Sequence, residues 1–325
     1  MEARLHRVSA ALVLTALFIV PLHAAGYRTT NFTVDAPTPQ LAQEIGDMAE
    51  HWRRELAIEW LGQELPDWSR PCPIKAQVSP QLGAGGATSF VFDQGEVFGW
   101  RMNIQGSRER ILDSVLPHEV THTIFASHFR QPLPRWADEG ACTTVEHRSE
   151  ISKQENMLIE FLRNRRGIPF SHMFAMQEYP QDVMPLYAQG HSLAMFLISQ
   201  HGKREFLTFL ADGLEDENWP RAVQEHYGHR HLLALQNSWM DWIRQGRPEL
   251  RSSGDNVLVA SHNAPLRPIS APIVRGQDPA AGSVYSAAGS LKVGPTPGTS
   301  QDWPIENTRT GSVYDASRET GTILR

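Results

Sequence analysis

The feature that most constrains the fold of this chain is the pentapeptide His118-Glu119-Val120-Thr121-His122, which matches the pattern HExxH. In an α-helix, residues four positions apart lie on one face, so both imidazoles can reach a single metal ion. Glu119 lies about 100° around the helix from His118, beside such an ion rather than on it. The apolar residues that flank the pentapeptide predict a buried helix, which bends or restarts at Pro117 because proline lacks a backbone donor.

A third metal ligand is expected, because a catalytic zinc usually takes three protein ligands and leaves a fourth position for water. His128 stands where the metzincin pattern HExxHxxGxxH places its last histidine. Phe125, however, occupies the position of the glycine that ends the helix in a sharp turn. The other possible ligand is Glu139, and its neighbour Asp138 either supports a ligand from behind or is an exposed acid at a helix start.

Around Glu139 the chain resembles the gluzincins, the HExxH…E peptidases that include thermolysin-like enzymes, and most of all their small peptidase-MA-like members. These proteins carry Trp-x-x-Glu-Gly on the helix after the HExxH helix, and Trp136, Glu139 and Gly140 match it. The resemblance covers roughly residues 30–245 and is specific only around 115–142. It favours Glu139 over His128 as the third ligand.

The resemblance implies a zinc ion held by His118, His122 and Glu139, with Glu119 as the general base. It also implies a downstream Tyr or His that donates a hydrogen bond to the oxyanion of the substrate. The residues that fit this role are Tyr187 and His191, four positions apart on one helix face, with Tyr179 as a further possibility. The alternative is a packing tyrosine and a surface histidine.

The order of the patterns predicts an α+β fold with a small N-terminal sheet followed by a helical half. A helix starts at Thr38-Pro39, and strands are expected at 74–78, 88–92 and 97–104, the last two as a hairpin after a glycine-rich turn at 82–87. Later helices are expected at 108–127, 134–148, 151–164, 184–200, 203–212 and 230–244. The resemblance implies a zincin-like, thermolysin-type core, and by analogy the strand 97–104 is the sheet edge that pairs with a peptide.

The two ends of the chain differ from this domain, which we place at 26–246. Residues 1–25 contain Arg4 and Arg7, an apolar run and then small residues, the order of a secretory signal. The apolar run is short for a membrane span of ~20 residues, although an uncleaved anchor is an alternative. Residues 247–325 are roughly one-third Gly, Pro and Ser and predict a low-complexity, disordered tail.

The net charge bears on the binding partners of the chain, and the cysteines bear on its redox state. The formal net charge of −6 gives no reason to expect nucleic-acid binding. Cys72 and Cys142, the two cysteines of the chain, either form a disulfide in an oxidising compartment or are buried free thiols.

Together these observations predict an exported, periplasmic or secreted zinc metallopeptidase that acts on peptide or protein substrates. One alternative is a non-catalytic zinc-containing module that binds peptides or has a structural role. The other is a metzincin-type peptidase that uses His128.

Overall fold

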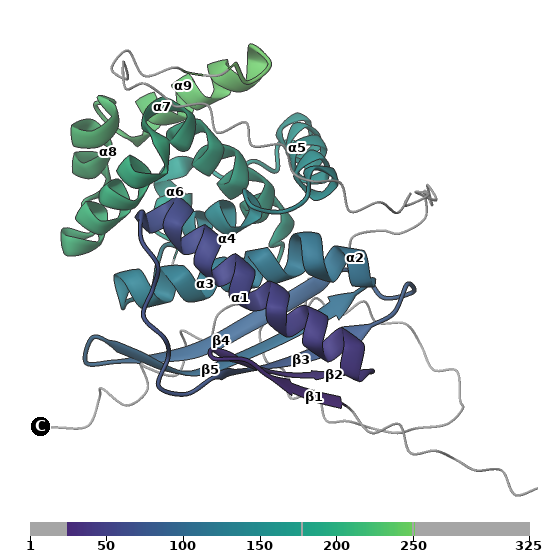
Figure 1. Cartoon of the computed structure of the whole chain (residues 1–325). Helices are drawn as coiled ribbons and strands as arrows, with labels where there is room; N and C mark the ends of the chain where they lie inside the picture. Colours follow the sequence, from purple (N-terminus) through teal and green to yellow (C-terminus); the bar gives the residue numbers. More distant parts are fainter. Residues whose placement is uncertain (1–24, 177, 249, 251–325) are drawn as a thin grey trace, which may run out of the picture.

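The chain has an α+β fold with a small mixed sheet and many helices, as expected (Figure 1). The computed structural model describes residues 25–176, 178–248 and 250. The strands are β1 (Ala25–Arg28), β2 (Phe32–Ala36), β3 (Cys72–Val78), β4 (Gly85–Asp93) and β5 (Glu96–Gly106). The first helices are α1 (Pro39–Leu61), α2 (Arg108–Arg110), the π-helical turn η1 (Ile111–Val115) and α3 (Leu116–Phe129). The remaining helices are α4 (Arg135–Thr143), α5 (Arg148–Arg163), α6 (Phe170–Phe174), α7 (Met184–Asp216), α8 (Trp219–Tyr227) and α9 (Leu232–Arg244).

The sheet has the strand order β1-β2-β3-β5-β4. Its centre is parallel, since β3 pairs in parallel with both β2 and β5, whereas β1 and β4 are antiparallel to their neighbours. The expected hairpin is present, but β5 lies inside the sheet, so the expectation that 97–104 forms its edge is wrong. The turn at Gln94 and Gly95, both with positive φ, folds the hairpin so that β5 reaches β3 and β4 is left at the edge. β4 also begins within the stretch expected to be a turn.

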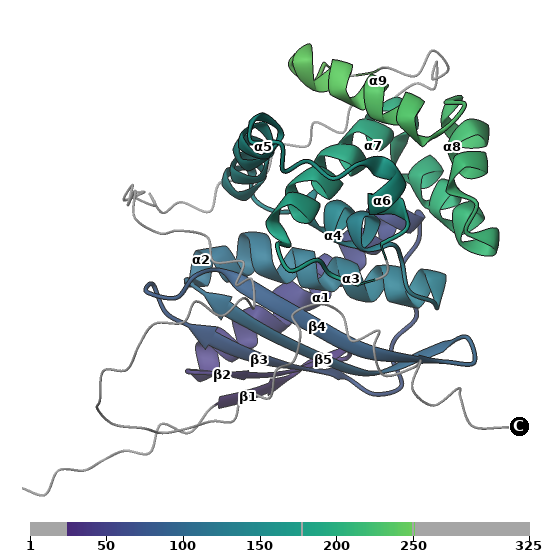
Figure 2. The ribbon, with the colours of Figure 1, turned by 180° about the vertical axis from the view of Figure 1, so that it is seen from behind.

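One layer of helices separates the sheet from the rest of the helical half. Figures 1 and 2 show α1 and α3 together on one face of the sheet, with α4 to α9 beyond them. Thr38 caps α1 by accepting a hydrogen bond from the backbone of Leu41, and Gly62 ends it in the left-handed conformation. The buried face of α1 includes Ile45 and Trp60, and the Trp60 ring meets that of Phe125 edge-on at 5.0 Å. α3 thus lies beside α1, between the sheet and the helical half.

The expected helix at 108–127 is divided into three parts. α2 passes into the π-helical turn η1, and α3 starts at Leu116 with Pro117 in its first turn. The two boundaries lie just before Pro117, which cannot donate the backbone hydrogen bond that a continuous helix needs. α3 then runs without interruption past Phe125 to Phe129 and ends where Arg130 adopts a positive φ of 54°.

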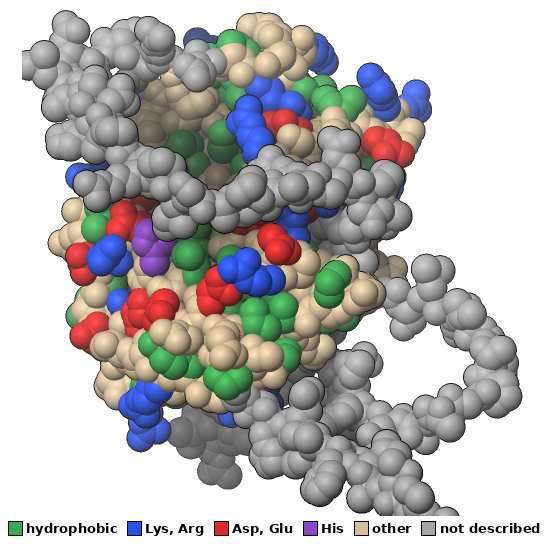
Figure 3. Space-filling model, turned by 45° about the vertical axis from the view of Figure 1, so that its right-hand side comes forward, with side chains coloured by type: hydrophobic (Ala, Val, Ile, Leu, Met, Phe, Trp, Pro, Cys, Tyr) green, Lys and Arg blue, Asp and Glu red, His purple; other side chains and the backbone are tan. Residues whose placement is uncertain are grey.

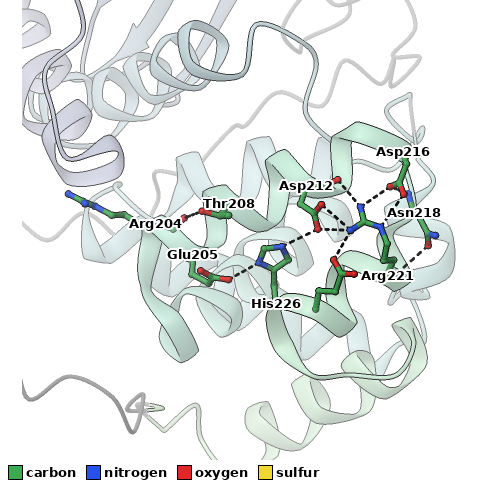
Figure 4. Close-up of polar contacts among 9 residues, drawn as sticks. Arg204, Glu205, Thr208, Asp212, Asp216, Asn218, Arg221 and His226 are labelled. Carbon is green, nitrogen blue, oxygen red and sulfur yellow. Dashed lines mark hydrogen bonds and ion pairs between the residues drawn. The ribbon is translucent and has the colours of Figure 1, made fainter.

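The helical half follows the expected order with a few differences. The helices expected at 184–200 and 203–212 form the two arms of α7, which is broken at Gly202 (φ 83°, ψ 174°). The short helices α6 and α8 and the strands β1 and β2 were not expected. Figure 4 shows how α8 is tied to the end of α7: Arg221 bonds to Asp212 and Asp216, and His226 lies between Glu205 and Asp212.

Cys72 and Cys142 are both buried free thiols, so the disulfide alternative is wrong. Burial raises the pKa of the Cys72 thiol to about 12. Among the described residues no helix is both long and apolar enough to cross a membrane. The expected signal segment and all but a few residues of the expected tail lie outside the described residues. On the face shown in Figure 3, the coloured acidic and basic side chains are interspersed rather than segregated.

Candidate metal centre

Helices α3 and α4 bring three polar side chains to one point in the interior. Nε2 of His118 lies 3.5 Å and Nε2 of His122 lies 3.7 Å from Oε2 of Glu139. All three residues are buried, with at most 6% of their surface exposed. Ligand atoms around a tetrahedral zinc ion with bonds of about 2.0–2.1 Å lie about 3.4 Å apart. The separations from Glu139 to the two imidazoles therefore suit a single ion between them.

The other nitrogen of each imidazole bonds to a second carboxylate. Nδ1 of His118 lies 2.7 Å from Oε1 of Glu146, and Nδ1 of His122 lies 2.8 Å from Oδ1 of Asp138. Metal-binding histidines usually donate their second ring N–H in this way, which fixes the tautomer and turns the remaining nitrogen toward the metal. Asp138 thus supports a histidine from behind, one of the two roles considered for it, and it is not an exposed acid. Glu146 was missed, although its place two helical turns after Glu139 was a usable signal.

The electrostatics of this group favour a positive charge at its centre. Burial works against charged imidazoles, but Glu139 and Glu146 raise the pKa of His118 well above its usual value. Burial likewise opposes the charge on His122, yet Asp138 raises its pKa to about 9. Burial would raise the pKa of Glu139, but the imidazoles lower it to about 2. A divalent ion can replace the protons on the two Nε2 atoms and satisfy the same carboxylates.

A cysteine is also close to the imidazole pair. His118, His122 and Cys142 form a buried group whose ligand atoms all lie within 4.8 Å of one another and which could hold a metal ion. Sγ of Cys142 lies 3.4 Å from Nδ1 of His122, the nitrogen that also bonds to Asp138. Burial raises the pKa of the Cys142 thiol well above its usual value, and nearby carboxylates add to this. Glu139 is not part of this group, but its Oε2 approaches the Nε2 atoms of both histidines.

Glu119 lies beside the metal centre, and a residue of the sheet holds its side chain in place. Its Oε2 accepts a hydrogen bond of 2.6 Å from the hydroxyl of Thr88 on β4. Burial raises the pKa of Glu119, while the charges of His122 and His118 act in the opposite direction. A carboxylate with a raised pKa is better suited to accept a proton near neutral pH than an ordinary surface carboxylate is.

Two tyrosines lie near the same carboxylates. The hydroxyl of Tyr179 donates a hydrogen bond of 2.5 Å to Oε1 of Glu139, the oxygen that faces away from the imidazoles. The guanidinium of Arg135 lies 4.5 Å from the centre of the Tyr179 ring. Tyr187 packs beside Tyr179 with ring centres 6.3 Å apart, and burial followed by the charges of Glu139 and Glu119 raises its pKa. The structure therefore brings both tyrosines to the centre.

His191 is not a surface residue, because only 1% of its surface is exposed. Burial lowers the pKa of its ring to about 4, although the backbone of Gly140 on α4 acts in the opposite direction, and its Nδ1 has no hydrogen-bond partner among the described residues. At neutral pH it is therefore an uncharged side chain at the contact between α4 and α7.

His128 does not join the metal centre. It lies on α3 six residues after His122, about 240° further around the helix, and its ring packs against Phe129 at 4.8 Å. Because α3 continues through Phe125, the sharp helix end that would return His128 to the ion is absent. The structure thus gives no support to the metzincin-type alternative.

No protein-family model matches this chain, and no curated protein matches it.

Proposed function

We propose that this chain is a zinc-dependent metallopeptidase of the gluzincin type that hydrolyses peptide bonds. The observation that carries the proposal is the approach of one Glu139 oxygen to Nε2 of both His118 and His122, with Glu119 beside them. A purely structural zinc site has no need of a buried carboxylate in the position of Glu119. The buried setting of this carboxylate, only 4% exposed, favours catalysis over a structural role.

In this proposal His118, His122 and Glu139 would hold a zinc ion, which would supply a Lewis acid for the attacking water and the scissile carbonyl. Glu119 accepts the proton of the attacking water and passes it to the departing amine. Tyr187, which packs beside Tyr179 near the charges of Glu139 and Glu119, donates a hydrogen bond to the oxyanion. His191 contributes by packing at the contact between α4 and α7, where burial keeps its ring uncharged.

The fold supports a place for an extended substrate. β4 is one of the two edge strands, and it contacts α3 through Thr88 and Glu119. An exposed strand edge can pair with a peptide through backbone hydrogen bonds. We infer that β4, rather than β5, receives the substrate, and that the sheet with α3 and α4 forms a thermolysin-type core. The basic and apolar pattern of the N-terminal segment extends the proposal to an exported enzyme.

A second candidate function rests on the group of His118, His122 and Cys142. If the thiolate of Cys142 joined His118, His122 and Glu139 as a fourth ligand, the ion would have no place for water and the chain would be a non-catalytic zinc module. Zinc accepts histidine and cysteine ligands together readily. The two proposals differ in whether Cys142 is a ligand, which substitution can identify.

The substitution Glu119→Gln tests the proposed peptidase. The variant is expected to bind about one zinc ion per chain, as the original protein does, because Glu119 is not a ligand. The original protein is expected to cleave a mixed peptide library until a chelator is added. The variant is expected to cleave none of it, because it lacks the base. Glu109→Gln, at an exposed position on α2, is the matched control and should cleave normally. Cleavage retained by Glu119→Gln would overturn the assignment of the base.

A further inference from the structure

We propose that Thr88 is a positioning residue that holds the carboxylate of Glu119 off the metal ion, and that Gly86 leaves the space which this carboxylate occupies. Both residues lie on β4, two positions apart and therefore on the same face of the strand. The inference rests on the proposed function, because it concerns the same centre.

The contact between Thr88 and Glu119 is short and shielded from water. The hydroxyl oxygen of Thr88 lies 2.6 Å from Oε2 of Glu119. Thr88 is 2% exposed and Glu119 is 4% exposed. A hydroxyl that donates to a carboxylate forms a charge-assisted hydrogen bond, and in a buried place no solvent replaces it when the hydroxyl is removed. One oxygen of Glu119 is thus fixed by the sheet.

Gly86 accommodates the rest of the carboxylate. A Cβ atom added at Gly86 would lie 2.5 Å from Oε1 of Glu119, 2.7 Å from its Cγ and 2.8 Å from its Cδ. The strand cannot easily retreat from this contact, since Gly86 is paired with Ile104 of β5. The glycine is therefore required by the space that Glu119 fills, so both oxygens of the carboxylate are located by β4.

The position matters because Glu119 is adjacent to His118 in sequence. Zinc accepts carboxylate oxygens as ligands, so a loose carboxylate at this place can turn onto the ion held by His118 and His122. An oxygen that coordinates the ion is no longer available to accept a proton from water. The hydrogen bond to Thr88 keeps Glu119 in the position of a base.

The test compares Thr88→Val, Thr88→Ser and Gly86→Ala with the original protein loaded with Co²⁺. The visible absorption of Co²⁺ reports the number and type of its ligands. Thr88→Val and Gly86→Ala are expected to change the spectrum, and Thr88→Ser to keep it because serine retains the donor. With zinc, Thr88→Val is expected to lower kcat about 10- to 100-fold, with KM nearly unchanged, on the library peptide that is cleaved fastest.

The control is Thr123→Val, which removes a buried threonine hydroxyl that donates to the carbonyl of Val120 and does not contact Glu119. It should keep the spectrum and kcat. Gly86→Ala retains Thr88, and its Co²⁺ spectrum serves as the test if Thr88→Val does not fold. An unchanged spectrum and a kcat within about twofold for Thr88→Val would overturn the inference. If the original protein binds Co²⁺ but cleaves no peptide, the proposed function fails and the spectra alone decide the role of Thr88. If it binds neither Co²⁺ nor zinc, both proposals fall.

Discussion

Gly140 of α4 and Gly190 of α7 contact each other through their backbones. A Cβ atom at Gly190 would lie 2.5 Å from the carbonyl oxygen of Trp136, and one at Gly140 would fall on the carbonyl group of Gly190. The two helices therefore cross without a side chain between them. Because Glu139 directly precedes Gly140, this close crossing fixes against α7 the part of α4 that carries the carboxylate.

Gly140→Ala is expected to destabilise the protein by about 1–3 kcal/mol, because the added methyl group meets backbone that cannot rotate away. Zinc binding should weaken as well, since the displaced helix carries Glu139. Urea unfolding measures the first effect and a competition titration with a zinc-binding dye measures the second. Gly26→Ala is the control, because a Cβ there meets no atom within 4 Å. Equal stability of the two variants would show that the crossing tolerates a side chain.

Glu139→Gln and Cys142→Ala identify the third ligand. Loss of a direct ligand should weaken zinc binding by more than the roughly 10–100-fold that loss of an outer partner costs. We expect this loss for Glu139→Gln and a change of less than about tenfold for Cys142→Ala, both measured as zinc dissociation constants. The reverse order would favour the structural zinc site built on the cysteine.

Asp138→Asn and Glu146→Gln test the carboxylates behind the imidazoles. Each change keeps the shape of the side chain but removes the charge that orients and polarises the bonded histidine. Zinc affinity is expected to fall about 10–100-fold for each variant. Asp241→Asn is a suitable comparison, because Asp241 pairs with Arg244 at an exposed place on α9. Unaltered affinity in both variants would show that these carboxylates do not tune the ligands.

Arg221→Gln tests the network that ties α8 to α7 (Figure 4). Its hydrogen bond lowers the pKa of Asp216, and it also outweighs the effect of burial to lower the pKa of Asp212. In the unfolded state both carboxylates have the ordinary pKa of about 3.9, whereas in the folded state their pKa values are lower. The stabilisation is therefore complete above the unfolded pKa and is lost as the pH falls through the folded pKa values.

The variant should therefore unfold at a lower temperature than the original protein at pH 7, by a few degrees at most because the network is partly exposed. The difference should shrink toward pH 3. Thermal unfolding followed by circular dichroism between these pH values measures it. Arg54→Gln, which breaks the exposed pair with Glu55, should have a smaller effect. A difference independent of pH would mean that Arg221 acts through packing alone.

Several strands and helices were not predicted from the sequence, each for its own physical reason. β1 and β2 are four and five residues long, too short to give a clear alternation. α6 is likewise only five residues long. The helix start at Asn218 and Trp219 could have been recognised, since the asparagine caps α8 and Pro220 follows at a permitted position.

The sequence by itself determined what depends on the geometry of a single helix. The spacing of His118 and His122 places both imidazoles on one face of α3, and the order of strands before helices already implied an α+β fold. The tertiary structure alone decided which side chains from other elements join them: the oxygen of Glu139, the hydroxyl of Thr88 and the sulfur of Cys142. Distances within a helix are fixed by the repeat of the backbone, whereas distances between helices and strands depend on how their side chains pack, as Gly140 and Gly190 show.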